Sequence, residues 1–381
     1  MKRQGSTDRD YHDFIVRSGG TFILGLITDG FSRLAGRPTR RSKIGSLWRR
    51  HFAHLLRRRP ITVLTNSHYI RDEGGCSRAL MTMYAISYCR KFGIPYRHTP
   101  FTGVHHAERG QEEWDRNWEE FFNLGTGEVP AAGRESETFD LFLLTFLKKP
   151  GGEDLVRFVR PALPDFRPIY YFVFSELPEG KFRQLFEGMF VDLLQPMVPE
   201  FRARFRQSRP AVRNAVFTVA MHVRRGDVGP GRQDMWTDSE SFSRTLASVR
   251  QALSQRGLAH RILIFSQGKQ EDFAEFDGPD VEFHLDADPF WTLEQMIDSD
   301  LLVMSKSSFS YVAAMLSDGL AVYEPCQIPP LPHWIMRDGQ GDLDIDVLKG
   351  RLEHYLASKD DVLPAGNAGS PSPEAITAPH P

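Results

Sequence analysis

The feature that most constrains the fold is a series of five short apolar segments that alternate with amphipathic ones. The apolar segments have the length and β-branched content of buried strands, while the intervening segments repeat apolar residues at helical spacing. Strands that alternate with helices are typical of an α/β fold with a parallel, doubly wound sheet. The expected strands are 216–223, 261–265, 281–285, 301–304 and 320–323, with helices at 237–255, 271–276, 292–298 and 308–316.

The first of these helices has a recognisable start signal. Thr237 and Glu240 fit a capping box, in which each side chain accepts a hydrogen bond from the backbone N–H group at the other position. We therefore expect the helix to begin there and to run to about Gln255.

The first half of the chain carries a shorter version of the same pattern. A β-branched strand at 61–64 is followed by the glycine pair Gly74-Gly75 and a helix over 77–92, which Gly93 should end before a strand at 94–96. A second helix, over 112–124, carries an aromatic face. Burial in the core explains this face better than a lip over a cleft; it consists of Trp114, Trp118, Phe121 and Phe122.

Length and composition support two such sheets. The chain has 381 residues, of which 41% are apolar, enough for two domains with sizeable cores. The basic, proline-containing segment 202–213 separates the halves. We expect an N-terminal extension (1–59), a first Rossmann-like domain (60–205), a second (206–360) and a disordered tail rich in proline and glycine (361–381).

The net charge of −2 hides a basic segment near the start of the chain. Residues 30–70 hold ten Lys and Arg side chains and no acidic one. An anionic membrane surface is one partner for such a segment, and a solvated extension docked on the body is the alternative. Nucleic acid is not expected, because no nucleic-acid-binding motif accompanies the charge. Three cysteines and the lack of a run of about 20 apolar residues favour a cytoplasmic protein.

Polar side chains gather where two of the predicted strands end. His222-Val223-Arg224-Arg225-Gly226-Asp227 follows the first strand of the second half, and Ser305-Lys306-Ser307-Ser308-Phe309-Ser310 follows the fourth. Ligands of open parallel sheets bind at the carboxyl ends of the strands. Because guanidinium groups and helix N-termini both suit phosphate oxygens, these loops indicate a diphosphate ligand.

Each of these residues also has a purely structural interpretation. His222 fits a hydrogen-bonded core histidine, Arg224 and Asp227 fit a surface ion pair, and Ser307 fits a helix cap. The sequence leaves these alternatives open.

The two motifs together resemble those of the inverting fucosyltransferase superfamily, nearest to its α1,2-fucosyltransferase (family 11-like) branch. His222 to Asp227 matches His-x-Arg-Arg-x-Asp, and Ser305 to Ala314 resembles Ser-x-Ser-Ser-Phe-Ser followed by an aromatic residue and alanines. The resemblance implies a GT-B-like fold, in which two Rossmann-like domains face each other. It also implies metal-independent, inverting transfer of fucose from GDP-fucose to a glycan hydroxyl, with no cofactor and no bound metal.

The resemblance also implies roles for individual residues. Arg224 would hold the β-phosphate and stabilise the leaving diphosphate, Arg225 would orient the loop, and Asp227 would fix the arginines. The second half would bind the sugar nucleotide and the first half the acceptor. The implied donor-binding residues are His222, Arg224, Ser266, Gln267, Asp286, Ser305, Ser307, Ser308, Phe309, Gly74 and Gly75.

Two segments depart from the family pattern. The Gly-Gly-x-Gly-Asn-Gln turn is half present, because Gly74-Gly75 is followed by Cys76-Ser77-Arg78. The segment that usually offers an acid to guanine reads Ser266-Gln267-Gly268, for which Asp286 or Asp288 would substitute. Another nucleotide sugar, or a catalytically silent sugar-nucleotide-binding or glycan-binding protein of the same fold, are therefore alternatives.

The acceptor hydroxyl must lose a proton to a nearby carboxylate or imidazole. His105 and Glu108 are candidates for this general base, and a solvated loop or a metal site are the alternatives for their segment. Both residues lie in a histidine-rich segment that also contains His98 and His106, with Asp72 and Glu73 as rivals. Taken together, these features predict a bacterial cytoplasmic enzyme that the basic extension could hold near the inner membrane.

Overall fold

The computed structural model describes two blocks of the chain. The described residues are 64–65, 74–93, 95–107, 110–131, 191–232, 234–326 and 328–360. The expected extension (1–59), the expected tail (361–381), the strand residues 61–63 and the candidate base Glu108 lie outside them.

The larger sheet lies in the second half and is parallel throughout. Its order is β6-β5-β4-β7-β8-β9, so the chain starts in the middle, moves to one edge and then crosses to the other. The expected α/β fold is confirmed, and all five expected strands are present. Their bounds are β4 Phe217–His222, β5 His260–Ser266, β6 Val281–Leu285, β7 Leu301–Val303 and β8 Leu320–Tyr323, with β9 Ile335–Met336 as a sixth strand.

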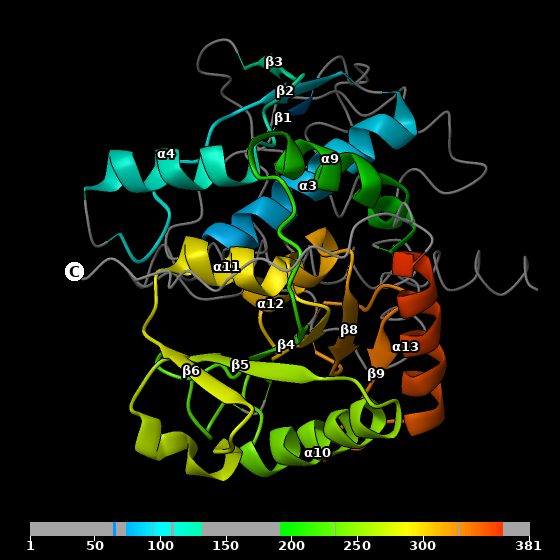
Figure 1. The fold of residues 1–381 in the computed structure, drawn as a ribbon. Coiled ribbons are helices and arrows are strands. Elements are labelled where there is room, and N and C mark those ends of the chain that lie inside the picture. Colours follow the sequence, from blue (N-terminus) through cyan, green and yellow to red (C-terminus); the bar gives the residue numbers. More distant parts are fainter. Residues whose placement is uncertain are drawn as a thin grey trace, which may run out of the picture.

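Helices cover both faces of this sheet (Figure 1). Helices α10 (Ser239–Gln255) and α13 (Ile345–Asp360) lie on one face, and α11 (Pro289–Ile297) and α12 (Ser308–Leu316) on the other. The alternation of strand side chains explains this: Val219 and Met221 pack in the same core as α10 and α13, while Ala220 packs with α11 and α12. A 3-10 segment, η2 (Gln270–Phe276), links β5 to β6.

The first half forms a small parallel sheet with helices beneath it. Its order is β1-β2-β3, from β1 (Leu64–Thr65), β2 (Tyr96–His98) and β3 (Val129–Pro130). Helix α3 (Gly75–Phe92) ends at Gly93, which adopts the left-handed conformation (φ 63°), as the sequence predicted. Helix α4 (Gln111–Phe122) ends at Asn123, also left-handed (φ 52°).

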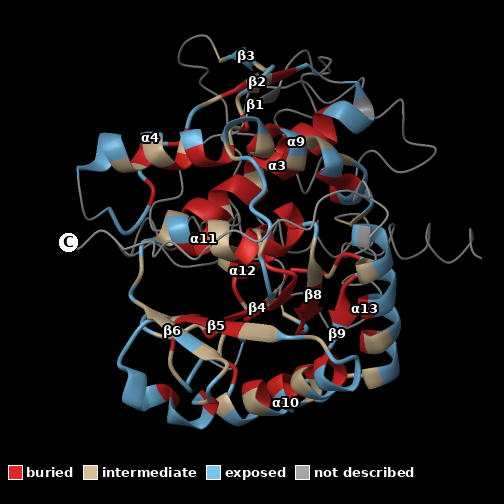
Figure 2. Ribbon diagram, in the orientation of Figure 1, coloured by how far each residue is buried: buried red, intermediate tan, exposed pale blue. Residues whose placement is uncertain are grey.

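The helices of the two halves share one core. Helix α3 packs against α12, so α3, α9 and the α11/α12 layer lie between the two sheets (Figures 1 and 2). The aromatic face of α4 belongs to this core, as expected: Trp118, Phe121 and Phe122 are buried, and Trp118 packs on Phe290 of α11 with ring centroids 4.6 Å apart.

The segment between the halves is docked on the second half. After η1 (Gln195–Met197), helix α9 (Val198–Ser208) carries Arg202 and Arg206, and Arg209 follows. These three arginines form ion pairs with Asp318, Asp298 and Glu294, respectively, which lie in or next to α11 and α12. The expected domain boundary, between residues 205 and 206, falls inside α9. The division of the chain into two domains there stays a prediction.

The expected capping box of α10 is wrong. The N-cap is Asp238, with no side-chain capping bond, and the Thr237 hydroxyl instead donates to Glu324 at 2.7 Å. A buried carboxylate beyond β8 competes successfully for the hydroxyl that the local pattern assigns to the helix.

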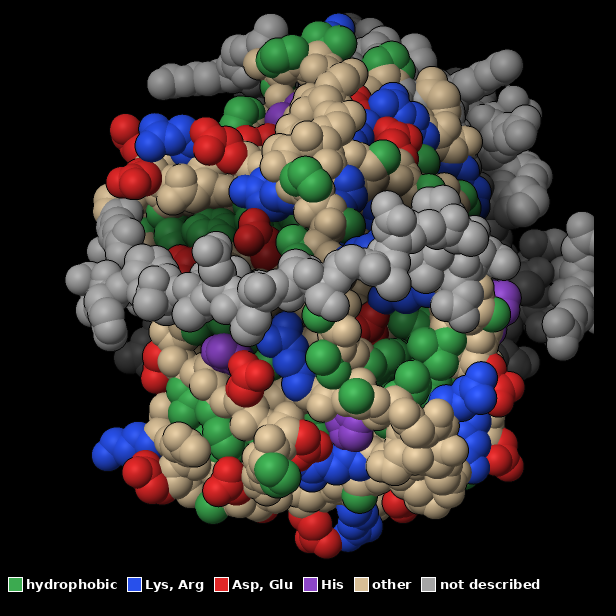
Figure 3. Space-filling model, viewed as in Figure 1, with side chains coloured by type: hydrophobic (Ala, Val, Ile, Leu, Met, Phe, Trp, Pro, Cys, Tyr) green, Lys and Arg blue, Asp and Glu red, His purple; other side chains and the backbone are tan. Residues whose placement is uncertain are grey.

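The described surface mixes the two signs of charge. On the face seen in Figure 3, basic and acidic side chains are intermingled over the upper and lower layers. No helix among the described residues is long and apolar enough to cross a membrane.

Candidate functional site

The two motif loops lie side by side at the carboxyl edge of the large sheet. Strand β4 pairs with β5 on one side and with β7 on the other. The chain leaves β4 toward α10 on one face of the sheet, and it leaves β7 toward α12 on the other face. Numbered within this sheet, the strand order is 3-2-1-4-5-6, for which the crevice beyond the first and fourth strands is the expected ligand site. The loop after β4 carries Arg224 and Asp227, and the loop after β7 carries Ser305 to Ser308.

Arg224 joins the two loops. Its Nε and Nη2 donate to the two carboxylate oxygens of Asp227 at 3.2 and 2.7 Å. Its Nη1 donates to the Lys306 carbonyl oxygen of the neighbouring loop at 3.3 Å. These bonds leave part of the guanidinium's donor capacity unused among the described residues, and the side chain keeps 18% of its surface exposed. The arginine is therefore held in place and still open to a ligand.

Arg225 points to a different environment from Arg224. Its guanidinium stacks 3.9 Å from the centroid of the Trp236 ring, and it donates to the Ser239 hydroxyl and to the Arg224 carbonyl oxygen. Burial lowers the pKa of Arg225, and nearby carboxylates oppose this effect. Its position suits the loop-orienting role implied by the sequence.

His222 is a neutral, partnered histidine. Its Nδ1 lies 2.8 Å from the Ser305 hydroxyl, and its ring packs against Phe309. Burial, with the positive charge of Arg224 as a second cause, lowers the pKa of His222 to about 3. The expected core interpretation therefore describes its contacts correctly, yet these same contacts fix the ring at the strand end beside Arg224.

The serines of the second loop differ in availability. Ser305 is buried and bonded to His222 and Ser310, and the Ser307 hydroxyl caps α12 by accepting from the Phe309 N–H. Ser308, the first residue of α12, is half-buried and has no hydroxyl partner among the described residues. The open groups of this loop are thus the Ser308 hydroxyl and the N–H groups at the start of α12 other than that of Phe309.

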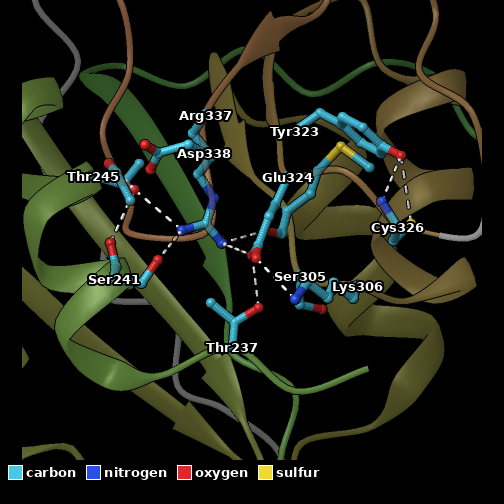
Figure 4. Close-up of polar contacts among 12 residues, drawn as sticks. Thr237, Ser241, Thr245, Ser305, Lys306, Tyr323, Glu324, Cys326, Arg337 and Asp338 are labelled. Atoms are coloured by element: carbon cyan, nitrogen blue, oxygen red, sulfur yellow. Dashed lines mark hydrogen bonds and ion pairs between the residues drawn. The ribbon is translucent and has the colours of Figure 1, made fainter. Parts of the chain in front are cut away.

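A buried ion network supports the second loop from behind (Figure 4). The Glu324 carboxylate, just after β8, accepts from Arg337 at 2.8 Å, Lys306 at 3.0 Å and Thr237 at 2.7 Å. Arg337 also donates to the hydroxyl of Ser241, and Lys306 to the Trp236 carbonyl oxygen. The sequence motifs omit Glu324 and Arg337, which become visible only when the ends of β7, β8 and β9 are placed together.

The segment Ser266-Gln267-Gly268, which was expected to contact the nucleobase, begins with the last residue of β5. The Ser266 hydroxyl donates to the Val223 carbonyl oxygen, and the Gln267 side chain lies over Gly226, whose positive φ (84°) and lack of a Cβ make room for it. Asp286 accepts from the Gly268 N–H at 3.3 Å. Asp286 therefore lies beside this segment, as the sequence interpretation requires.

Asp288 has a structural task of its own. Its carboxylate caps α11 by accepting from the N–H groups of Phe290 and Trp291. Asp286 or Asp288 was expected to replace the acid that usually contacts guanine. Of the two carboxylates, only that of Asp288 caps a helix, so Asp286 is the better candidate for contact with a ligand.

The glycine pair lies at the start of α3 and has two different environments. Gly74 is the N-cap, and a Cβ there would meet nothing within 4 Å. A Cβ on Gly75 would overlap the Trp118 ring, so this glycine is needed for close packing. The packing explains Gly75 without a phosphate.

The histidine segment of the first half is exposed at its end. His105 and His106 are exposed neighbours with ring centroids 4.0 Å apart. Burial raises the pKa of Asp227, but hydrogen bonds and charges, those of Arg224 first and that of His106 among them, hold it below its usual value.

His98 is a structural residue. It is buried, and its Nε2 lies 2.7 Å from a Glu119 carboxylate oxygen. Among the described residues, no three His, Cys, Asp or Glu side chains come together as a metal site.

No protein-family model and no curated protein matches the chain. Solved structures give distant likenesses. The Escherichia coli heptosyltransferase WaaC with ADP is 12% identical, covering 77% of this chain and 99% of its own, with a TM-score of 0.38. A family 9 glycosyl transferase from Veillonella parvula is 10% identical, covering 78% of this chain and 97% of its own (TM-score 0.38). POFUT1 in complex with GDP-fucose is 11% identical, covering 72% of this chain and 96% of its own (TM-score 0.32).

Proposed function

We propose that this protein is a metal-independent, inverting glycosyltransferase that transfers fucose from GDP-fucose to a glycan hydroxyl. The observation that carries the proposal is the bridge that Arg224 forms between two anion-suited loops at the switch point of the large sheet. A nucleoside diphosphate placed there meets a guanidinium on one side and the N-terminus of α12 on the other.

This arrangement suits a reaction in which a diphosphate departs. As the sugar–oxygen bond breaks, negative charge develops on the β-phosphate, and a guanidinium held by Asp227 is already oriented to stabilise it. Lys306, in the neighbouring loop after β7, adds a second positive charge, and Glu324 fixes its ammonium group. In this proposal the arginine and the lysine supply the electrostatic stabilisation that a divalent metal provides in other transferases.

The environment of His222 supports a neutral contact to the nucleotide. With a pKa lowered to about 3, the ring carries no charge at neutral pH, so it can donate or accept one hydrogen bond without competing with Arg224 for the phosphate.

The nucleobase of the donor is inferred from the side chains beyond β5 and β6. Guanine offers adjacent N–H donors that suit a carboxylate, and Asp286 is the carboxylate beside the Ser266–Gln267 segment. Gln267 carries a carboxamide at the same place, which favours a different base and makes another nucleotide sugar the second candidate donor.

The test is calorimetric titration of GDP, without added metal, into the wild-type protein and three variants. Arg224→Ala should weaken GDP binding by roughly 10-fold to 100-fold, the range of a charge-assisted hydrogen-bond pair. Arg224→Lys should also bind weakly, because an ammonium group keeps the charge but lacks the planar fork that bonds both Asp227 oxygens and the neighbouring loop. Arg244→Ala is the matched control, since it removes an exposed arginine that pairs with Glu240 on α10. Equal GDP affinity in folded wild-type and Arg224→Ala proteins would contradict the proposal.

A further inference from the structure

Trp236 has a ring whose contacts lie outside the hydrophobic cores. It lies in the loop between β4 and α10 and is half-buried, yet it belongs to neither of the two apolar clusters that the described residues form. Its ring instead packs on the Arg225 guanidinium, with 3.9 Å between the ring centroid and Cζ. Among aromatic side chains, tryptophan attracts a guanidinium most strongly, through the negative face of its ring. The ring therefore serves a cation of the β4 loop.

Hydrogen bonds fix both members of this pair at the start of α10. The Trp236 indole N–H donates to the Asp238 carboxylate at 2.9 Å, and its backbone N–H donates to the Arg232 carbonyl oxygen at 2.7 Å. Asp238 is the N-cap of α10. The Arg225 guanidinium donates to the hydroxyl of Ser239, the first residue of that helix, at 3.1 Å. The ring and the guanidinium thus share one anchor.

The backbone at Trp236 also reaches the loops after β7 and β8. The Trp236 carbonyl oxygen accepts from the Lys306 ammonium group at 3.1 Å. The next residue, Thr237, donates its hydroxyl to Glu324 at 2.7 Å, and Glu324 pairs with Lys306 at 3.0 Å (Figure 4). Two consecutive residues of the β4 loop therefore hold Lys306 and its carboxylate partner.

Through Arg225, the same tryptophan acts on Arg224. Arg225 Nη1 donates to the Arg224 carbonyl oxygen at 2.8 Å, and Arg224 Nη1 donates to the Lys306 carbonyl oxygen at 3.3 Å. The three side chains are all cations, which repel one another unless each has a partner that holds it. Trp236 supplies a partner for two of them, because its ring holds Arg225 and its carbonyl oxygen holds Lys306.

We propose that Trp236 is a positioning residue that makes this site selective for a nucleoside diphosphate over the corresponding monophosphate. The inference rests on the proposed function. A diphosphate adds a terminal phosphate group and further negative charge, and these are what a set of cations from two loops binds best. Trp236 acts through Arg225, which fixes the backbone at Arg224, and through Lys306. Loss of its ring should therefore weaken the contacts to the terminal phosphate and spare those to the nucleoside.

The test is calorimetric titration of GDP and of GMP into the full chain and its variants, without added metal. Trp236→Leu keeps an apolar side chain but removes the aromatic face, so GDP should bind roughly 5-fold to 30-fold more weakly. GMP affinity should change by less than about 2-fold, because GMP lacks the terminal phosphate. Trp236→Phe retains an aromatic face and should keep GDP affinity within about 3-fold of the wild-type value.

Tyr355→Leu is the matched control, since it removes an aromatic ring from another cation. The Tyr355 ring centroid lies 4.8 Å from the Lys359 ammonium group, and the Tyr355 hydroxyl donates to Asp300. Asp300 directly precedes β7, so this pair lies at the amino edge of the large sheet, opposite to Arg224. The ratio of GDP affinity to GMP affinity should equal that of the wild-type protein.

A double-mutant cycle separates positioning from a general loss of structure. Arg225→Ala should itself weaken GDP binding, and adding Trp236→Leu should then cost less than about 2-fold, because no guanidinium remains for the ring to hold. Arg225→Lys disturbs the same stack from the other side and should show the same selective loss of GDP affinity, which keeps the inference testable where Trp236→Leu does not fold.

Two results would overturn the inference. One is an equal loss of GDP and GMP affinity in the folded Trp236→Leu or Arg225→Lys protein. The other is the same cost of Trp236→Leu with and without Arg225.

Failure of this inference is distinguishable from failure of the proposed function. A wild-type chain that binds neither GDP nor GMP removes both together. GDP binding that depends on Arg224 but is unchanged in Trp236→Leu removes the role of Trp236 alone. A wild-type chain that binds GDP and GMP equally well also removes this inference and leaves the nucleotide site standing.

Discussion

Glu324→Gln is the substitution that most severely tests how the site is built. The Glu324 carboxylate accepts hydrogen bonds from Arg337, Lys306 and Thr237 (Figure 4). The side chains of Glu324 and Arg337 are only 2% and 0% exposed. Glutamine keeps the volume but removes the charge, so the Arg337 guanidinium is left buried among neutral partners.

The size of the effect follows from this burial. Removing one partner of a buried ion pair costs about 3–5 kcal/mol, because the remaining charge stays desolvated. A body of the described size changes its Tm by roughly 2–4 °C for each kcal/mol. We therefore expect Glu324→Gln to lower the Tm by roughly 6–20 °C. GDP affinity should also fall, since Lys306 loses the carboxylate that orients its ammonium group.

The assay is thermal unfolding with and without GDP, beside two reference variants. Arg244→Ala breaks an exposed pair and should cost about 1 kcal/mol or less. The double variant Glu324→Gln/Arg337→Met removes both charges and should regain part of the loss, because no unpaired charge is then left buried. A Tm for Glu324→Gln as close to wild type as that of Arg244→Ala would refute the reasoning.

Two further predictions follow from single residues. Gly75→Ala should destabilise the fold by about 1–3 kcal/mol, because its Cβ would overlap the Trp118 ring. Gly74→Ala should be tolerated, because its Cβ would meet nothing within 4 Å. Equal urea midpoints for the two variants would contradict this account of the packing. Burial lowers the pKa of His222 from 6.5 in the unfolded chain to about 3 in the folded one. The free energy of unfolding should therefore fall as the pH drops from 6.5 toward 3, by up to about 1.4 kcal/mol per pH unit. His222→Gln should lack this component, and parallel stability curves for the two proteins between pH 7 and pH 4.5 would argue against it.

Much of the second half could be predicted from the sequence because its inner strands, β4, β5, β7 and β8, are largely buried. Such strands are continuous apolar runs, and the helices between them have one apolar face, so both kinds of element show in the pattern. Parallel connection then places the loops after β4 and β7 at one edge. What the pattern does not contain is the order of the strands, and the order makes those two loops neighbours.

The errors come from contacts that are distant in sequence. Thr237 has the spacing of a capping box, but its partner is Glu324, which lies 87 residues away. Strand β9 has only two residues and follows a proline-rich loop, so it gives no periodic signal. Gly75 is a donor-binding residue by the resemblance, and the structure adds a second reason for a glycine there, because a Cβ would overlap the Trp118 ring. For Thr237 and Gly75, the contact that explains the residue lies far away in the sequence, so the local pattern does not show it.

The most direct test of the central claim is a thermal-shift panel of GDP, UDP, ADP, CDP and GDP-fucose with no metal added. A ligand that binds only the folded chain stabilises it by about 2.7 kcal/mol at 100 times its Kd, or roughly 5–10 °C in Tm. The account predicts this shift with GDP and GDP-fucose, and a shift reduced to roughly half or less in Arg224→Ala at the same ligand concentration. An unchanged Tm with all five ligands would contradict a nucleotide-sugar site at the edge of β4 and β7.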